Sequence, residues 1–195
     1  MVEPDPAGVE RALLAGGLAC PGCRGELRPW GRAPRRLRDF EADRPVGVRR
    51  SRCQGCRVTH VLLPVVALAR RRDLAEVIGV ALAAKAAGAG HRRIADELVL
   101  PPTTVRGWLR RFTVGAGPIR DHFTRLAHGL DPGLGSICPR GSPVRDAVEA
   151  IGVAAAAAAR RLGPAASPWQ FAAGATGGLL LAAGSNTSGL FPAAW

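Results

Sequence analysis

Four cysteines stand in two pairs of identical spacing in the first third of the chain. Cys20 and Cys23 enclose Pro-Gly, and Cys53 and Cys56 enclose Gln-Gly, so a glycine precedes the second cysteine each time. Zn²⁺ prefers four tetrahedral ligands, and the tight turn of a Cys-x-x-Cys segment, which glycine favours, can supply two thiolates with backbone amides directed at the sulfurs. The two pairs therefore predict one structural zinc ion held by these four side chains.

Other interpretations of the cysteines are open. A thioredoxin-like redox role would need a pair at the start of a helix in a strand-helix-strand context, which the sequence does not indicate; chance is the remaining alternative. His60 follows Cys56 by four residues and could bind metal. Because four cysteines already complete a structural site, we interpret His60 as a strand or packing residue and expect no catalytic position on the zinc. Cys138 has no paired neighbour and is interpreted as a free or buried thiol.

The segment between the cysteine pairs must fold back on itself to bring them together. "GELRPWGRAPRRLRD" and "RPVGVRRSR" flank the turn-like "FEADRP", which indicates a long hairpin and a zinc ribbon over residues 20–63. From Pro64 the apolar spacing becomes helical, and Asp73 with Glu76 resembles a capping box at the start of a helix. Two shorter amphipathic helices follow within residues 91–112, joined by a tight connection.

These two shorter helices resemble a helix-turn-helix. The motif has a small residue in its first helix, here Ala95, and apolar residues ten and thirteen positions later, here Val105 and Trp108. It departs from the usual pattern at Val99, where glycine is common. The resemblance implies a DNA-binding domain over residues 64–112, with the outward face of the second helix in the major groove. The contacts expected are Arg92, Arg93, Thr103, Thr104, Arg106, Arg110 and Arg111, joined by Arg49, Arg50 and Arg52 of the hairpin.

The charge of the chain is concentrated in the same region. The formal net charge is +12, and residues 20–112 carry 20 Lys and Arg against 8 Asp and Glu, whereas residues 113–195 carry 6 against 4. Such a surplus attracts polyanions, which favours nucleic acid over an anionic membrane as partner. The alternatives are the arginine bias of a GC-rich genome and a small helical bundle whose arginines are merely solvated.

Residues 20–112 as a whole resemble a bacterial arrangement of zinc ribbon followed by helix-turn-helix. The resemblance rests on the stretches "CPGC", "LRPWG", "RCQGCRVTHVLLP", "HRRIA" and "TVRGWLRRF". It is to an uncharacterised family of stand-alone proteins from GC-rich bacteria, and to the N-terminal DNA-binding region of some insertion-sequence transposases. It covers about half of the chain. What it implies is recognition of double-stranded DNA, without a particular biological role.

The remainder of the chain gives weaker signals. Residues 1–19 form an N-terminal segment, and residues 113–195 indicate Ala-rich helices separated by glycine and proline breaks. Such helices more often pack on each other or on a second copy than carry out chemistry, so we expect a helical scaffold or dimerisation element, compatible with a homodimer. The fold class predicted is therefore mainly α with a small β zinc ribbon, followed by the helix-turn-helix and a C-terminal helical region.

Catalysis is not expected. A transposase core needs three carboxylates on a ribonuclease-H-like sheet to hold two metal ions, and the second half offers Asp121, Asp131, Asp146 and Glu149 in helical or turn contexts. No Ser/His/Asp arrangement, phosphate-binding glycine loop or HExxH motif occurs. We therefore predict a protein that is not an enzyme.

The sequence also suggests where the protein acts. Its apolar stretches fall short of the roughly 20 residues that span a bilayer, and its start does not resemble a secretory signal, so we expect a cytoplasmic, nucleoid-associated protein with no membrane partner. The predicted function is a zinc-stabilised, sequence-specific DNA-binding protein, either a transcriptional regulator or an accessory factor of a mobile element. Two alternatives are the DNA-binding fragment of a transposase whose catalytic half is absent or on another chain, and a protein-interaction module docking through the ribbon.

Overall fold

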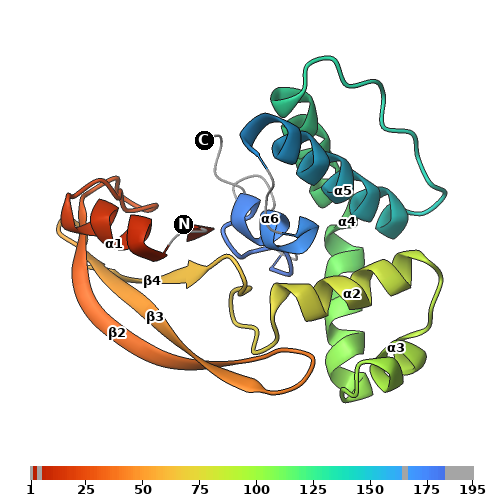
Figure 1. Ribbon diagram of the computed structural model, residues 1–195, viewed down its shortest axis with the longest axis horizontal. Coiled ribbons are helices and arrows are strands. Elements are labelled where there is room, and N and C mark those ends of the chain that lie inside the picture. The colour runs from red at the N-terminus through yellow and green to blue at the C-terminus, as the bar shows by residue number, and fades with distance from the viewer. Residues whose placement is uncertain (1, 4–5, 164–166, 183–195) are drawn as a thin grey trace.

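The computed structural model describes residues 2–3, 6–163 and 167–182, which form six helices and four strands (Figure 1). The elements in chain order are β1 (Val2–Glu3), α1 (Pro6–Leu14), β2 (Leu27–Arg38), β3 (Asp43–Cys53), β4 (Thr59–Pro64), α2 (Ala75–Ala86), α3 (His91–Glu97), α4 (Pro102–Leu130), α5 (Pro143–Leu162) and α6 (Pro168–Ala175). The prediction of a mainly α protein with a small sheet is confirmed. None of the helices in these described ranges combines the length and the apolar character needed to cross a membrane.

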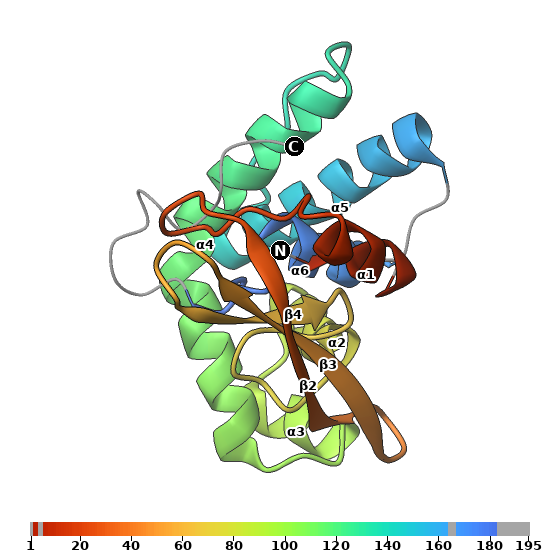
Figure 2. The same ribbon diagram turned by 90° about the vertical axis from the view of Figure 1, so that its left-hand side faces the viewer.

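The sheet is built on one long hairpin. Strands β2 and β3 pair antiparallel over their full length, β4 adds antiparallel to β3, and the two residues of β1 pair parallel to β4, in the order β1-β4-β3-β2. Figure 2 shows the hairpin as a twisted ribbon that extends well beyond the shorter β4. The register of β2 shifts between Pro29 and Gly31, which makes Trp30 the extra residue of a β-bulge.

A small apolar cluster holds α1 against one side of this sheet. It consists of Leu13, Leu18, Cys20, Leu27, Cys53 and Leu62, with Val9 and Ala12 packed against it. Two of its six members are cysteines of the predicted zinc site. A cluster of this size buries little apolar surface, so the sheet and α1 depend on additional interactions for their stability.

The helices enclose a separate and larger core. Figure 1 shows α2 crossing α4 with α3 at one end of the crossing, while α5 lies along the later turns of α4. The buried stripe of α4 consists of Val105, Trp108, Leu109, Phe112, Ala116, Ile119, Phe123 and Ala127. Alanines of α5 pack in the same core, from Ala147 to Ala154, so the Ala-rich face that we expected to serve packing or dimerisation contacts α4 of its own chain.

One helix crosses the domain boundary that the sequence suggested after Phe112. We expected a short second helix to end there, because glycines and Pro118 follow, whereas α4 continues to Leu130. The apolar stripe explains the difference, since Phe112, Ala116 and Ile119 keep a helical spacing and are fully buried. Burial of this face outweighs the unfavourable helix propensity of the glycines and of Pro118. Within residues 113–182 the described helices are the rest of α4, then α5 and α6, with the non-helical segment 131–142 between α4 and α5. Residues 164–166 and the end of the chain from residue 183 lie outside the described residues.

The capping box expected at the start of α2 is not formed. The helix begins at Ala75 with Leu74 as its N-cap, and no side chain caps it. Asp73 is instead buried and accepts an ion pair from Arg38 of the hairpin, with 2.6 Å between nitrogen and oxygen. The Asp73 carboxylate, which the local sequence pattern assigned to the start of α2, therefore pairs with the end of β2 instead.

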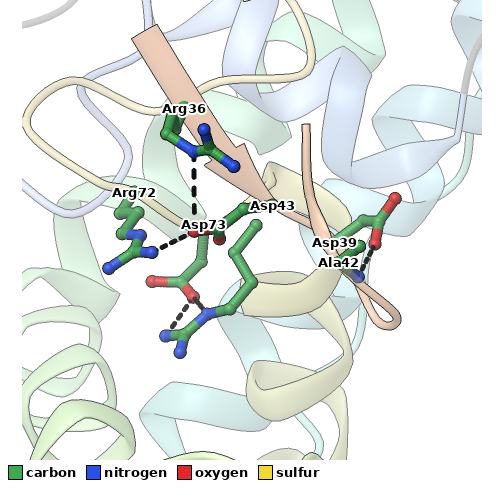
Figure 3. A network of polar contacts seen from close by, with 7 residues as sticks. Arg36, Asp39, Ala42, Asp43, Arg72 and Asp73 are labelled. Atoms are coloured by element: carbon green, nitrogen blue, oxygen red, sulfur yellow. Dashed lines mark hydrogen bonds and ion pairs between the residues drawn. The ribbon is translucent and has the colours of Figure 1, made fainter. Parts of the chain in front are cut away.

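Further polar contacts fix this end of the hairpin to the segment before α2 (Figure 3). The Arg38 N–H donates to the carbonyl of Arg72 at 2.8 Å, and the Leu74 N–H donates to the carbonyl of Arg38 at 3.0 Å. Asp43 accepts ion pairs from Arg36 and Arg72. These contacts join the turn end of the β2–β3 hairpin to the helical core, at a point remote from the cysteines.

Candidate metal centre and basic surface

The two cysteine pairs adopt the same local structure. The Cys20 N–H donates to the carbonyl five residues later, Gly25, at 2.7 Å, and the Cys53 N–H donates to Val58 at 2.9 Å. The residue after each pair, Arg24 or Arg57, has a left-handed φ of 64°. Two segments of different sequence thus form the same turn, a geometry that directs both cysteine side chains of each pair to one point.

The four sulfurs converge. All four Sγ atoms lie within 4.8 Å of one another, with 3.7 Å between Cys20 and Cys56 and 3.3 Å between Cys23 and Cys53. Each of these two contacts joins one turn to the other, across 36 and 30 residues of chain. Cys20 and Cys53 are buried, and Cys23 and Cys56 are exposed. The predicted set of four ligands is therefore brought together and could hold a metal ion.

Backbone amides point at the exposed sulfurs of both turns. The N–H of Gly25 is the largest influence on Cys23, and with hydrogen bonds from Cys53 and Cys56 it lowers the pKa of Cys23 to about 6. The N–H of Val58 lowers the pKa of Cys56 in the same way, but the thiolate of Cys23 and desolvation outweigh it and raise that pKa to about 11. Amide donors favour the thiolate form, which is the form that binds metal.

Two further residues lie against the cluster: His60, interpreted from the sequence as a strand or packing residue, and Gly25, to which the sequence assigned no role. His60, on β4, places Nε2 3.4 Å from the Sγ of Cys20, so this histidine contacts a predicted ligand. Gly25 leaves room for the sulfurs, since a Cβ there would lie 3.1 Å from the Sγ of Cys53 and 3.3 Å from that of Cys23. The glycine directly after Arg24 was a readable signal for this crowding, whereas the role of His60 depends on strand register.

The second group of predicted residues surrounds α3 and the start of α4. Ala95, Val105 and Trp108 are buried between the two helices, as the sequence pattern predicts. The connection runs through residues 98–101, and within it Val99 has a φ of +53° and is 89% exposed. Valine therefore occupies the backbone conformation for which glycine is usual at this place.

The predicted DNA contacts on these helices fall into two groups. Arg92, Thr103, Arg106 and Arg110 are exposed. The other three are less available: Arg93 pairs with Glu97 at 2.8 Å, Arg111 donates to the carbonyl of Gly107 at 3.0 Å, and Thr104 is half-buried. Residues 98–120 contain four arginines and no Asp or Glu, so every charged side chain on the exposed side of α4 in this region is basic.

The three hairpin arginines of the prediction lie on different faces of the sheet. Arg49 is directed to α1, where it pairs with Glu10 at 2.8 Å and keeps 19% of its side chain exposed. Arg50 and Arg52 alternate with it and lie on the opposite face. The guanidinium of Arg52 stacks over the ring of Trp30, 4.6 Å from the ring centroid.

Residues 20–108 match the model of a protein family described as a domain of unknown function, DUF6431. The matched segment contains all four clustered cysteines, the hairpin, α2, α3 and the first seven residues of α4. A search of curated proteins and a search of solved structures found no match to the chain.

Proposed function

We propose that this chain is a zinc-stabilised, sequence-specific protein for double-stranded DNA, in which α3 and α4 act as a helix-turn-helix. The observation that carries the proposal is the start of α4. One side of this helix is buried through Val105 and Trp108, and the other exposes Arg106 and Arg110 in a stretch without acidic residues. A helix held rigidly by its core and basic on its free side is suited to the major groove.

The metal proposed for the cysteine cluster is zinc. Four thiolates at the usual zinc-sulfur distance of about 2.3 Å, arranged as a tetrahedron, lie about 3.8 Å apart. The spacings of 3.7 and 3.3 Å, and the limit of 4.8 Å for the whole set, are close to this value. With four protein ligands the ion has a structural role, and it would join α1 to the start of β2 and the end of β3.

The exposed residues suggest a division of roles on DNA. Arg106 and Arg110 are one helical turn apart and can reach guanine edges, which arginine contacts with two hydrogen bonds. Thr103 lies at the start of α4, where free backbone amides favour a phosphate. Arg92 on α3 lies on the neighbouring helix and would neutralise a phosphate beside the groove.

The experiment compares Arg106→Ala with Arg125→Ala. A preferred duplex is first selected from a random library with the purified zinc-loaded protein. Arg125 is an exposed arginine of the same helix, about 28 Å further along its axis, so the two variants lose the same charge. We expect Arg106→Ala to weaken binding to the preferred duplex by about 1 to 3 kcal/mol and to relax the preference at one base pair. Arg125→Ala should retain both the affinity and the preference.

Other outcomes would point elsewhere. Equal weakening of preferred and scrambled duplexes by Arg106→Ala would mean that α4 attracts DNA without reading its sequence. No duplex binding at low salt would favour the protein-interaction alternative. Duplex cleavage by the purified protein with Mg²⁺ or Mn²⁺ would contradict the absence of enzymatic activity.

A further inference from the structure

One face of the ribbon sheet carries an aromatic ring among arginines. The face covered by α1 bears Ser51, His60, Arg49 and Leu62. The opposite face, which alternates with it along each strand, bears Arg28, Trp30, Arg50, Arg52, Thr59 and Val61. We call this second set the open face. In Figure 1 α1 lies next to β4, at the end of the hairpin opposite its turn.

The bulge in β2 presents Trp30 on the open face. Trp30 and Gly31 together stand opposite Arg50, and Gly31 accommodates the extra residue with a φ of +115°. The Trp30 side chain is 51% exposed, although tryptophan is usually largely buried. Because Arg52 covers one side of the ring, the exposed part includes the other side.

The charges around Trp30 are predominantly positive. Arg52 is held in place by donating its Nε–H to the carbonyl of Arg57 at 3.1 Å. The side chain of Arg50 makes no hydrogen bond or ion pair with the described residues of the chain. The side chain of Arg28 is engaged at the edge of the sheet, where it pairs with the partly exposed Glu26 at 2.8 Å and donates to the carbonyl of Leu14, the last residue of α1, at 3.4 Å. Exposed Val61 lies beside Arg50 on β4. The open face therefore combines an apolar ring with at least two uncompensated positive charges.

We propose that the open face binds an unpaired nucleic-acid strand, with a base stacked on Trp30 and phosphates contacted by Arg50 and Arg52. An exposed aromatic platform bordered by arginines is the arrangement by which proteins bind single strands irrespective of sequence. A duplex keeps its bases stacked on one another and offers no free base to the ring, so this ligand differs from the duplex proposed for α4. The arginines disfavour an apolar protein partner, and they select a polyanion.

The experiment measures binding of labelled ten-nucleotide oligo-dT and oligo-U to the full-length, zinc-loaded protein by fluorescence anisotropy. Trp30→Ala should weaken binding about fivefold or more, as expected for the loss of one stacked base, and Trp30→Phe should restore most of the affinity. Arg50→Ala should lower the slope of log affinity against log salt by about 0.7. Similar affinities for the two oligonucleotides would assign the site to either kind of strand, and a large difference to DNA or RNA alone.

Phe40→Ala is the matched control. Phe40 is an aromatic of similar exposure, 55%, on the same hairpin, but it stands between Asp39 and Glu41 at the far end. It should leave oligonucleotide binding unchanged. Equal weakening by Phe40→Ala and Trp30→Ala, or no effect of Trp30→Ala, overturns the proposal.

The same variants separate this site from the duplex site. Trp30→Ala should not affect the selected duplex, and Arg106→Ala should not affect the oligonucleotides. Loss of duplex binding in Arg106→Ala with unchanged oligonucleotide binding in Trp30→Ala would overturn the open face alone. The reverse result would overturn the proposed function alone.

Discussion

Val99 illustrates how a single residue can carry strain for the sake of a connection. A left-handed backbone costs an ordinary residue about 1 to 2 kcal/mol, and glycine adopts it freely. Because the Val99 side chain is almost fully exposed, removing it forfeits little packing. Val99→Gly should therefore raise the free energy of unfolding by about 0.5 to 1 kcal/mol in urea denaturation, once the greater flexibility of glycine in the unfolded chain is deducted.

The control for this substitution is Val114→Gly. Val114 is also exposed but lies within α4, where glycine lowers stability by about 0.5 kcal/mol relative to valine. Opposite signs for the two variants would confirm that the effect arises from the backbone at position 99. A loss of stability in both would show that the connection does not hold the left-handed conformation in solution.

At the scale of the residue, the sequence predicts which side chains bind the metal better than it predicts which side chains form ion pairs with one another. The four cysteines were identifiable because their spacing is local and repeated. Arg49 looked equivalent to Arg50, yet it pairs with Glu10, 39 residues away, and Asp73 looked like a helix cap, yet it pairs with Arg38, 35 residues away. Such contacts depend on strand register and on the docking of the hairpin, which no local pattern contains.

At the scale of the element, the contact between α2 and α6 depends on one glycine. A Cβ at Gly79 would lie 2.1 Å from Cγ of Trp169, which is a ring atom in the core and has no room to move. Gly79→Ala should lower the free energy of unfolding by about 1 to 3 kcal/mol, the usual cost of overpacking. Thermal or urea denaturation measures the change.

Gly152→Ala is the comparison. Gly152 lies within α5 with no atom within 4 Å of a Cβ built there, so alanine should be neutral or stabilise by up to about 1 kcal/mol. If Gly79→Ala behaved like Gly152→Ala, α6 would not pack on α2 in solution. The apolar faces of α3 and of the early turns of α4 were predictable here from periodicity. The start of α2 was not, because Asp73 pairs with Arg38 instead of capping the helix. The length of α4 was not predictable either, because its stripe of small and aromatic residues outweighs the glycines and proline that usually end a helix.

At the scale of the molecule, the two apolar clusters predict two levels of stability. Among the residues that the structure describes, the cluster beside the cysteines has six buried members and the helical core has 28. Removing metal with a chelator under reducing conditions should therefore abolish hydrogen-exchange protection in β2, β3 and β4 while α4 and α5 keep theirs. The native protein should contain about one zinc ion per chain.

Single cysteine variants check the same prediction. Cys53→Ser should lose the metal and reproduce the effect of the chelator, and Cys138→Ser, which removes an exposed cysteine outside the cluster, should keep it. Protection of the strands in fully metal-free protein would contradict a structural ion. Loss of protection in the ribbon and the helical core together would show that the contacts around Asp73 couple the two parts more strongly than their separate clusters suggest.

Because α4 is one continuous helix, a tilt of this helix moves both of its ends. At 1.5 Å per residue its 29 residues span about 43 Å, with exposed arginines on the early turns and α5 against the later ones. A stiff rod transmits tilt, so a rotation of about 5° around its middle displaces each end by roughly 2 Å, more than a hydrogen bond tolerates. A tilt of α4 that follows a shift of α5 would therefore move Arg106 and Arg110 together with α3, which packs on the same end of the helix.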